Sequence, residues 1–186
     1  MKILTPFIAL CIALTSLAES DSWAVFERCW DNYIAQPTHE NAIAVYKQLP
    51  NELLTQDFPG ERLVNKMYEG WPHISKKIIS GNKDAVEIGF KLYALVDGGF
   101  KEDVGADLGK LITVDAKLFL QELKKHRPLV QNLDGIVCNY GEEYVDKKEL
   151  RLEEADNRMR LLVNVNDPNL EDVKSECLDL LMDKTK

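Results

Sequence analysis

The stretch that decides the fold reads NKDAVEIGFKLYALVDGG and covers residues 82–99. Its apolar residues recur three and four positions apart, which is the spacing that places side chains on one face of an α-helix. Asn82 suits the helix N-cap, because its side-chain oxygen can accept a hydrogen bond from a backbone N–H of the first turn. Gly98 and Gly99 mark the end of the pattern. The stretch therefore predicts a deeply buried helix.

The same spacing continues on both sides of this helix. Thr38 is a candidate N-cap upstream, and Asp167-Pro168 is a strong start signal for the last helix, with the aspartate as cap and the proline in the first turn. We expect an interruption at Gly70-Trp71-Pro72, since the residue before a proline avoids the α region. The expected helices run over residues 22–36, 38–49, 61–81 in two pieces, 82–97, 102–112, 113–127, 129–140, 145–162 and 168–186.

No stretch alternates apolar and polar residues as a half-buried strand does, so the predicted fold is all-α with about eight to nine helices. Three of the helices open alike, with Asn41-Ala42, Asp84-Ala85 and Asp115-Ala116. Helices that open alike in this way between Thr38 and Tyr140 resemble an α-solenoid of the HEAT or armadillo kind. This is a likeness of architecture and not of family. An irregular helical bundle explains the same pattern, and both arrangements stay open.

Residues 1–18 are typical of a secretory signal segment. Lys2 supplies a positive charge, the rest of the segment carries none, and Ser16 and Ala18 are small residues of the kind that a signal peptidase accepts. The apolar stretch is shorter than the roughly 20 residues of a membrane-spanning helix. We therefore expect cleavage after Ala18, export to the bacterial periplasm or out of the cell, and one soluble domain over residues 19–186 without stable membrane insertion. A retained membrane anchor is the alternative.

The charge balance is acidic. The 186 residues include 23 Lys+Arg against 31 Asp+Glu, for a net charge of −8. A nucleic-acid binder needs an excess of basic residues to meet the phosphates, so nucleic acid is excluded as a partner. Acids gather over residues 142–156, but bases lie among them, and the spacing of Glu154 and Arg158 suits a salt bridge on a solvated helix face. An acidic docking surface for a basic partner is the alternative.

Three cysteines follow the signal segment: Cys29, Cys138 and Cys177. In an oxidising compartment an odd number allows at most one internal disulfide and leaves one thiol over. Cys138 and Cys177 are the favoured pair, because such a bridge would tie neighbouring C-terminal helices together. Three buried free thiols are the alternative. No basic neighbour is present to activate any of the three as a nucleophile.

Residues 105–111 read GADLGKL and differ from a phosphate-binding loop in two respects. Three residues separate the glycines where the loop has four, and Leu111 stands where a magnesium-binding Ser or Thr belongs. We therefore predict no phosphate site there.

The sequence contains no arrangement that assigns a catalytic residue, a cofactor or a metal. His39, His73 and His126 are isolated, and we expect them at the surface or at helix ends. Tyr68, Trp71 and His73 flank the expected helix interruption and form the best candidate for a pocket or contact surface, since Trp and Tyr are favoured anchors there. Burial in the core is the alternative for these aromatic residues.

The sequence favours an exported, non-catalytic helical protein whose partner is another protein. A sharper form of this hypothesis is a periplasmic inhibitor or immunity-type protein that binds a basic toxin or enzyme through charge complementarity. A carboxylate-dependent hydrolase is the alternative from the enzyme class. A ligand carrier with an apolar cavity near Trp71 is a further alternative.

Overall fold

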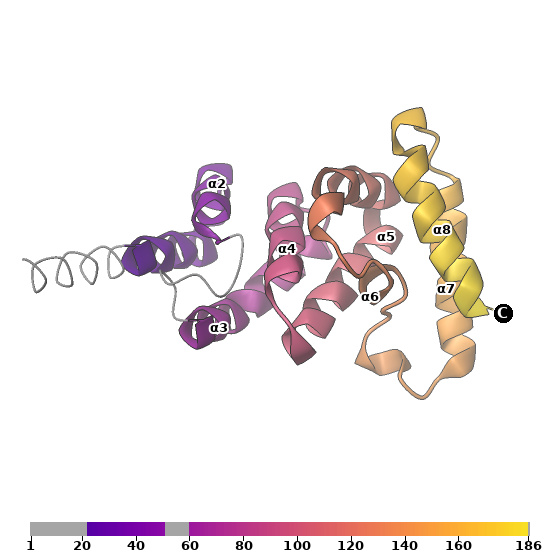
Figure 1. The fold of residues 1–186 in the computed structure, drawn as a ribbon, viewed down its shortest axis with the longest axis horizontal. Helices are drawn as coiled ribbons and strands as arrows, with labels where there is room; N and C mark the ends of the chain where they lie inside the picture. Colours follow the sequence, from indigo (N-terminus) through magenta and orange to yellow (C-terminus); the bar gives the residue numbers. More distant parts are fainter. Residues whose placement is uncertain (1–21, 51–59, 186) are drawn as a thin grey trace, which may run out of the picture. The chain divides into compact units, whose positions relative to one another are not determined.

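The computed structural model describes residues 22–50 and 60–185, and every regular element in these two ranges is a helix (Figure 1). The predicted all-α class is therefore confirmed. The chain divides into two compact units, Met1–Gly70 and Trp71–Lys186. No helix in the described part of the chain is long and apolar enough to cross a membrane. The predicted signal segment lies outside the described residues, and the single-domain organisation and the solenoid-like stacking stay predictions.

The first unit contains a helix over residues 22–35, α2 (His39–Gln48) and the first part of α3 (Gly60–Ile78). Trp30 lies so close to α3 that a Cβ added to Gly70 would be 2.5 Å from the indole Nε1. An ion pair between Lys66 Nζ and Asp31 Oδ1, at 2.7 Å, joins the same two helices at the surface. Large buried side chains of this unit include Trp23, Phe26, Trp30, Tyr33, Leu63 and Met67.

Helix α3 continues through Pro72, so the predicted interruption at Gly70-Trp71-Pro72 is wrong. Trp71 is buried, and its indole Nε1 donates a hydrogen bond to Asp107 Oδ2 at 3.1 Å. Ile74 and Ile78 are also fully buried. A proline inside a helix costs about 3 kcal/mol, and burial of three large side chains on one helix outweighs that local cost.

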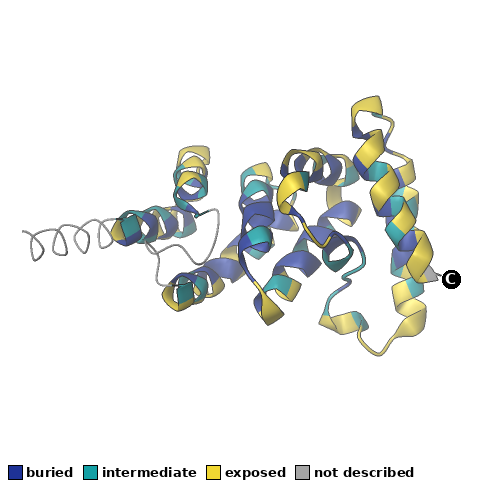
Figure 2. Ribbon diagram, viewed as in Figure 1, coloured by how far each residue is buried: buried dark blue, intermediate teal, exposed yellow. Residues whose placement is uncertain are grey.

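The second unit contains the end of α3 and the remaining helices, with most of α4 buried (Figure 2). These helices are α4 (Lys83–Leu95), α5 (Gly98–His126), α6 (Asp134–Val137), α7 (Lys148–Val163) and α8 (Glu171–Thr185). Contacts from α5 reach each of the other four, so α5 is the element around which this unit is arranged.

Three predicted N-caps are confirmed. The side chains of Thr38, Asn82 and Asp167 each accept a hydrogen bond from a backbone N–H two or three residues later, at 3.3, 3.0 and 3.1 Å. Thr38 and Asn82 start α2 and α4, and Asp167 starts the short 3₁₀ helix η3 (Pro168–Leu170) that leads into α8. A cap satisfies a backbone donor that the helix itself leaves without a partner, which is why these starts were predictable.

Helix α5 covers the two helices that we expected over residues 102–112 and 113–127. The backbone of Asp115 is not helical, with φ −153° and ψ 87°, so the run is kinked there. The carboxylate of Asp115 accepts a hydrogen bond from the backbone N–H of Leu118 at 2.9 Å. Asp115 therefore acts as an internal cap, and the predicted second helix begins at this residue.

The helix expected over residues 129–140 is much shorter. The structure has a 3₁₀ helix, η1 (Arg127–Leu129), and then only the four residues of α6. Asn132 Oδ1 accepts a hydrogen bond from the backbone N–H of Gly135 at 3.3 Å and so favours a start after Asn132. The end of α6 is set by long-range contacts described below.

The backbones of α6 and α5 are in close contact where the two helices cross. A Cβ added to Gly105 would overlap the carbonyl oxygen of Gly135, and one added to Gly109 would overlap the carbonyl oxygen of Ile136. Neither obstacle is a flexible side chain that could rotate away. The crossing therefore requires glycine at both positions of α5.

Gly109→Ala should destabilise the protein by about 2–4 kcal/mol, because the new methyl group must push α6 away from α5. Gly99→Ala is a matched control in the same helix, since a Cβ there meets nothing within 4 Å. Replacing a helical glycine at an open position changes stability by about 1 kcal/mol or less, in the stabilising direction. Urea unfolding followed by circular dichroism measures both variants, and equal stabilities for the two would contradict the close crossing.

A buried histidine lies at the end of α5. The ring of His126 stacks on Phe90, with the ring centroids 5.5 Å apart, and Nδ1 lies 2.9 Å from the carbonyl oxygen of Glu122. Burial lowers the pKa of His126 below 6.5, and burial together with the charge of Glu87 raises the pKa of the Glu122 carboxyl above 4.5. Folding therefore shifts both side chains toward their uncharged forms, and Lys83 and Lys125, at 3.7 and 3.8 Å from the Glu122 carboxylate, oppose the shift there.

The lowered pKa of His126 predicts that stability is lost as the pH falls below about 6.5, since the unfolded chain then binds a proton that the folded chain excludes. In His126→Gln this contribution is absent. The stability difference between the native protein and the variant should therefore shrink between pH 7.5 and 5.5. Denaturant unfolding at a series of pH values measures this, and parallel curves would show that His126 does not titrate in this way.

Candidate functional site

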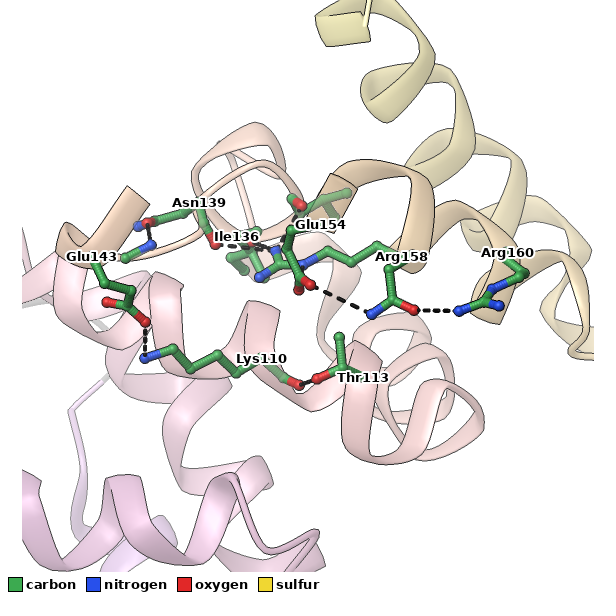
Figure 3. Close-up of polar contacts among 11 residues, drawn as sticks. Lys110, Thr113, Ile136, Asn139, Glu143, Glu154, Arg158 and Arg160 are labelled. Atoms are coloured by element: carbon green, nitrogen blue, oxygen red, sulfur yellow. Dashed lines mark hydrogen bonds and ion pairs between the residues drawn. The ribbon is translucent and has the colours of Figure 1, made fainter. Parts of the chain in front are cut away.

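A buried arginine organises the C-terminal part of the second unit (Figure 3). Arg158, in α7, is 1% exposed, so the prediction of a solvated position for it is wrong. Its Nη1 donates hydrogen bonds to the carbonyl oxygens of Val137 and Asn139 at 2.9 and 3.0 Å, and its Nε donates to Glu154 Oε1 at 3.0 Å. The last carbonyl groups of a helix have no partner within it. The guanidinium of Arg158 supplies that partner and so sets the end of α6.

Tyr140 lies against the same guanidinium. The Cζ atom of Arg158 is 4.7 Å from the centre of the Tyr140 ring, which is the geometry of a cation–π contact. Gly109 leaves the space for the arginine, since a Cβ there would be 2.8 Å from Nη1. We call this arrangement of Arg158, Glu154, Tyr140 and the carbonyl groups after α6 the arginine clamp.

A cavity of about 350 Å³ lies beside the arginine clamp. Asp134, Cys138 and Tyr140 line it from α6 and the chain that follows, Lys148 and Arg151 from α7, and Lys184 from the end of α8. Asp134 Oδ2 and Lys184 Nζ form an ion pair at 3.3 Å. The cavity therefore combines residues that lie up to fifty positions apart in the sequence.

A shallower groove of about 290 Å³ lies between the start of α7 and the 3₁₀ helix η2 (Glu142–Tyr144). It is lined by Glu143, Tyr144, Lys147, Leu150, Glu153 and Glu154, and we call it the η2–α7 groove. Glu143 Oε1 pairs with Lys110 Nζ of α5 at 3.2 Å (Figure 3). A hydrogen bond from its own backbone N–H and the nearby Lys110 lower the pKa of Glu143, so this carboxylate is ionised at neutral pH.

Two exposed apolar side chains accompany the groove. Val145, directly after η2, is 60% exposed, and Leu150, in the groove itself, is 43% exposed. Both sit among the acids of residues 142–156. Val114 and Val163 are exposed to a similar degree elsewhere, so the position of Val145 and Leu150 at the groove, and not their exposure alone, makes them candidates for a contact surface.

The described cysteines, Cys29, Cys138 and Cys177, are all free thiols, so the predicted disulfide between Cys138 and Cys177 is not present. Burial is the main cause that raises the pKa of the Cys138 thiol to about 12. The hydrogen bond between this thiol and Asp134, and the negative charge of Asp134, act in the same direction. Burial likewise raises the pKa of the Cys177 thiol to about 12. Both sulfur atoms therefore keep their protons, and the thiolate that disulfide formation needs is scarce.

The predicted contact surface consists of Tyr68, Trp71 and His73, and all three residues lie in α3. Trp71 packs edge-on against Phe100, with the ring centroids 5.8 Å apart, and belongs to the core. Tyr68 is 56% exposed, and His73 is also exposed. Trp71 therefore does not share an exposed surface with the other two, and a binding role for Tyr68 and His73 stays a prediction.

No three or more His, Cys, Asp or Glu side chains converge on a metal position anywhere in the described ranges. Comparisons of this chain with protein-family models, curated proteins and solved structures gave no match. The function is therefore inferred from the two hollows beside α7 and their chemistry.

At pH 8 we expect Cys138 and Cys177 of the folded protein to react with iodoacetamide about a thousandfold more slowly than in the unfolded chain. A pKa of about 12 in place of 9 lowers the thiolate fraction by that factor, and the thiolate is the reacting form. Peptide mapping by mass spectrometry after timed labelling, with and without urea, measures each cysteine separately. Equal rates in the two conditions, or a cross-linked peptide joining Cys138 to Cys177, would contradict the free, protonated thiols.

Proposed function

We propose that this chain is an exported, non-catalytic helical protein that binds a basic protein partner through the η2–α7 groove. The observation that carries the proposal is the exposure of Val145 and Leu150 beside a groove lined by carboxylates. Apolar side chains provide contact area that gains free energy when water is removed, and the surrounding acids select the charge of the partner.

The charge of this surface favours a basic partner. Residues 142–156 contain seven acids and three bases. Two of the bases, Lys148 and Arg151, line the cavity and not the groove, which leaves Lys147 as the base that lines the groove. An acidic surface accelerates encounter with a basic protein and repels an acidic one. A basic toxin or enzyme that this protein inhibits is the sharpest form of the proposal.

The hydrolase alternative has less support at the η2–α7 groove. A pair of catalytic carboxyls needs one member with a raised pKa, so that it can donate a proton. The pKa of Glu143, an acid of the groove, is instead lowered. Glu154, another acid of the groove, is held in the arginine clamp by Arg158.

The binding proposal is tested with the full mature chain as bait for proteins of the exported fraction. The double variant Val145→Ser/Leu150→Ser should lose the captured partner, because the apolar contact is removed while the charges stay. Val163→Ser is the matched control, since Val163 is 56% exposed but lies thirteen residues along α7 from Leu150, which is about 20 Å of helix.

Binding of the purified partner should weaken about tenfold or more in the double variant and stay unchanged in Val163→Ser. The partner should be basic, and its association should slow as salt is added. Capture of nothing, or equal binding by all three baits, would overturn the proposal.

A second pair of variants tests the role of charge. Glu149→Lys/Glu153→Lys should slow association with the same partner by about tenfold at low salt, because both side chains are exposed beside the groove. Lys174→Glu is not a suitable control, since Lys174 pairs with Glu171. The double variant Glu69→Lys/Asp179→Lys is suitable, because it makes the same change of net charge at two exposed acids that lie outside residues 142–156 and outside the groove lining. An equal effect of both changes would show that net charge and not this surface governs binding.

A further inference from the structure

We propose that the cavity between α6, α7 and α8 binds a small organic dianion, such as a short dicarboxylate or a phosphate monoester. This site goes beyond the proposed function, because its lining residues are distinct from those of the η2–α7 groove. Its volume of about 350 Å³ lies near the lower end of the sizes found for small-molecule sites.

The cations of the cavity are only partly neutralised. Lys184 pairs with Asp134 at 3.3 Å, which leaves the charges of Lys148 and Arg151 to be balanced. Neither of these two side chains forms an ion pair or a hydrogen bond with another residue in the described part of the chain. Two uncompensated positive charges facing one hollow match a ligand that carries two negative charges.

Tyr140 adds a donor that has no partner. The side chain is 8% exposed, and its hydroxyl oxygen is buried without a hydrogen-bond partner among the described residues. Burial raises the pKa of Tyr140 to about 12, helped by neighbouring Cys138, which also lines the cavity. The hydroxyl group therefore stays protonated and can donate to a ligand oxygen. Asp134 Oδ1, from the same lining, is also buried without a hydrogen-bond partner among the described residues, so the cavity wall holds one donor and one acceptor for a ligand or a water molecule to satisfy.

The wall that carries Tyr140 is held in place before any ligand arrives. Arg158 lies 4.7 Å from the centre of the Tyr140 ring and fixes the carbonyl groups of Val137 and Asn139 on either side of Cys138. A site whose donors are already positioned loses less conformational entropy on binding. The opposite wall is more open, since Lys148 and Arg151 are exposed and can close on a ligand from solvent.

Calorimetric titration of the full mature chain tests the site. Succinate and glycerol 3-phosphate serve as dianion probes, succinamide as the neutral probe of similar shape, and 1,4-diaminobutane as the cation. At least one dianion should bind saturably with one site per chain and a dissociation constant below about 1 mM, whereas the neutral and cationic probes should not bind. A preference for succinate indicates a dicarboxylate ligand, and a preference for glycerol 3-phosphate indicates a phosphate monoester.

Three variants locate the binding. Arg151→Gln and Lys148→Gln should each weaken dianion binding about tenfold, and Tyr140→Phe should weaken it severalfold through loss of the hydroxyl alone. Arg160→Gln is the matched control, because Arg160 is an exposed arginine of the same helix that bonds to Asn157 at 2.9 Å outside the cavity. Circular dichroism confirms that each variant is folded.

The proposal is overturned if no dianion binds with a dissociation constant below about 1 mM, if succinamide binds as well as succinate, or if Arg160→Gln weakens binding as much as Arg151→Gln. Failure of partner capture through the η2–α7 groove leaves these measurements unaffected, because the variants and the readouts are separate.

Discussion

The second unit depends on the satisfaction of one buried charge. A guanidinium that is 1% exposed would cost several kcal/mol if its N–H groups lacked acceptors. Glu154 supplies the counter-charge of Arg158, and carbonyl groups at the end of α6 supply the remaining acceptors. The dependence is mutual, because a helix of four residues has too few internal hydrogen bonds to be stable alone. The arginine needs these carbonyl groups, and the short helix needs the arginine.

The same constraint places the two hollows on either flank of α7. Arg158 turns one face of the helix inward. The residues at 148, 151, 152 and 155 then line the cavity, and those at 147, 150, 153 and 154 line the groove. Each set follows the spacing of three and four that defines one helix face. One helix therefore presents a cationic hollow and an acidic groove, and a protein partner and a small anion would meet different sides of it.

Local signals predicted local structure well. The caps formed by Thr38, Asn82 and Asp167 were predictable because donor and acceptor lie within three residues of each other. Pro72 shows the limit of such rules, since the proline preference is local but the burial of Trp71 depends on Asp107 and Phe100, about thirty residues away. The histidine at position 126 shows it again, because its burial against Phe90 follows from packing and not from its neighbours in sequence.

The candidate site was mostly beyond local rules. The spacing of Glu154 and Arg158 predicted their ion pair, but a charged helix with many acids and bases gave no sign that this arginine is buried. Gly105 and Gly109 stand in a stretch that differs from a phosphate loop, and in the structure they let the carbonyl groups of α6 approach α5. A pair of glycines four residues apart in a predicted helix was the signal in the sequence for that close crossing.

By itself, the sequence determined the helical class, the positions of the caps and the acidic balance, because periodicity, capping and charge act through near neighbours or through simple sums. Only the tertiary structure decided that Arg158 is buried, that α6 ends where it does, and that Asp134, Tyr140, Arg151 and Lys184 meet around one cavity. The physical reason is that a helical pattern shows which side chains share a face. Which backbone carbonyl that face meets depends on close packing between segments far apart in the chain.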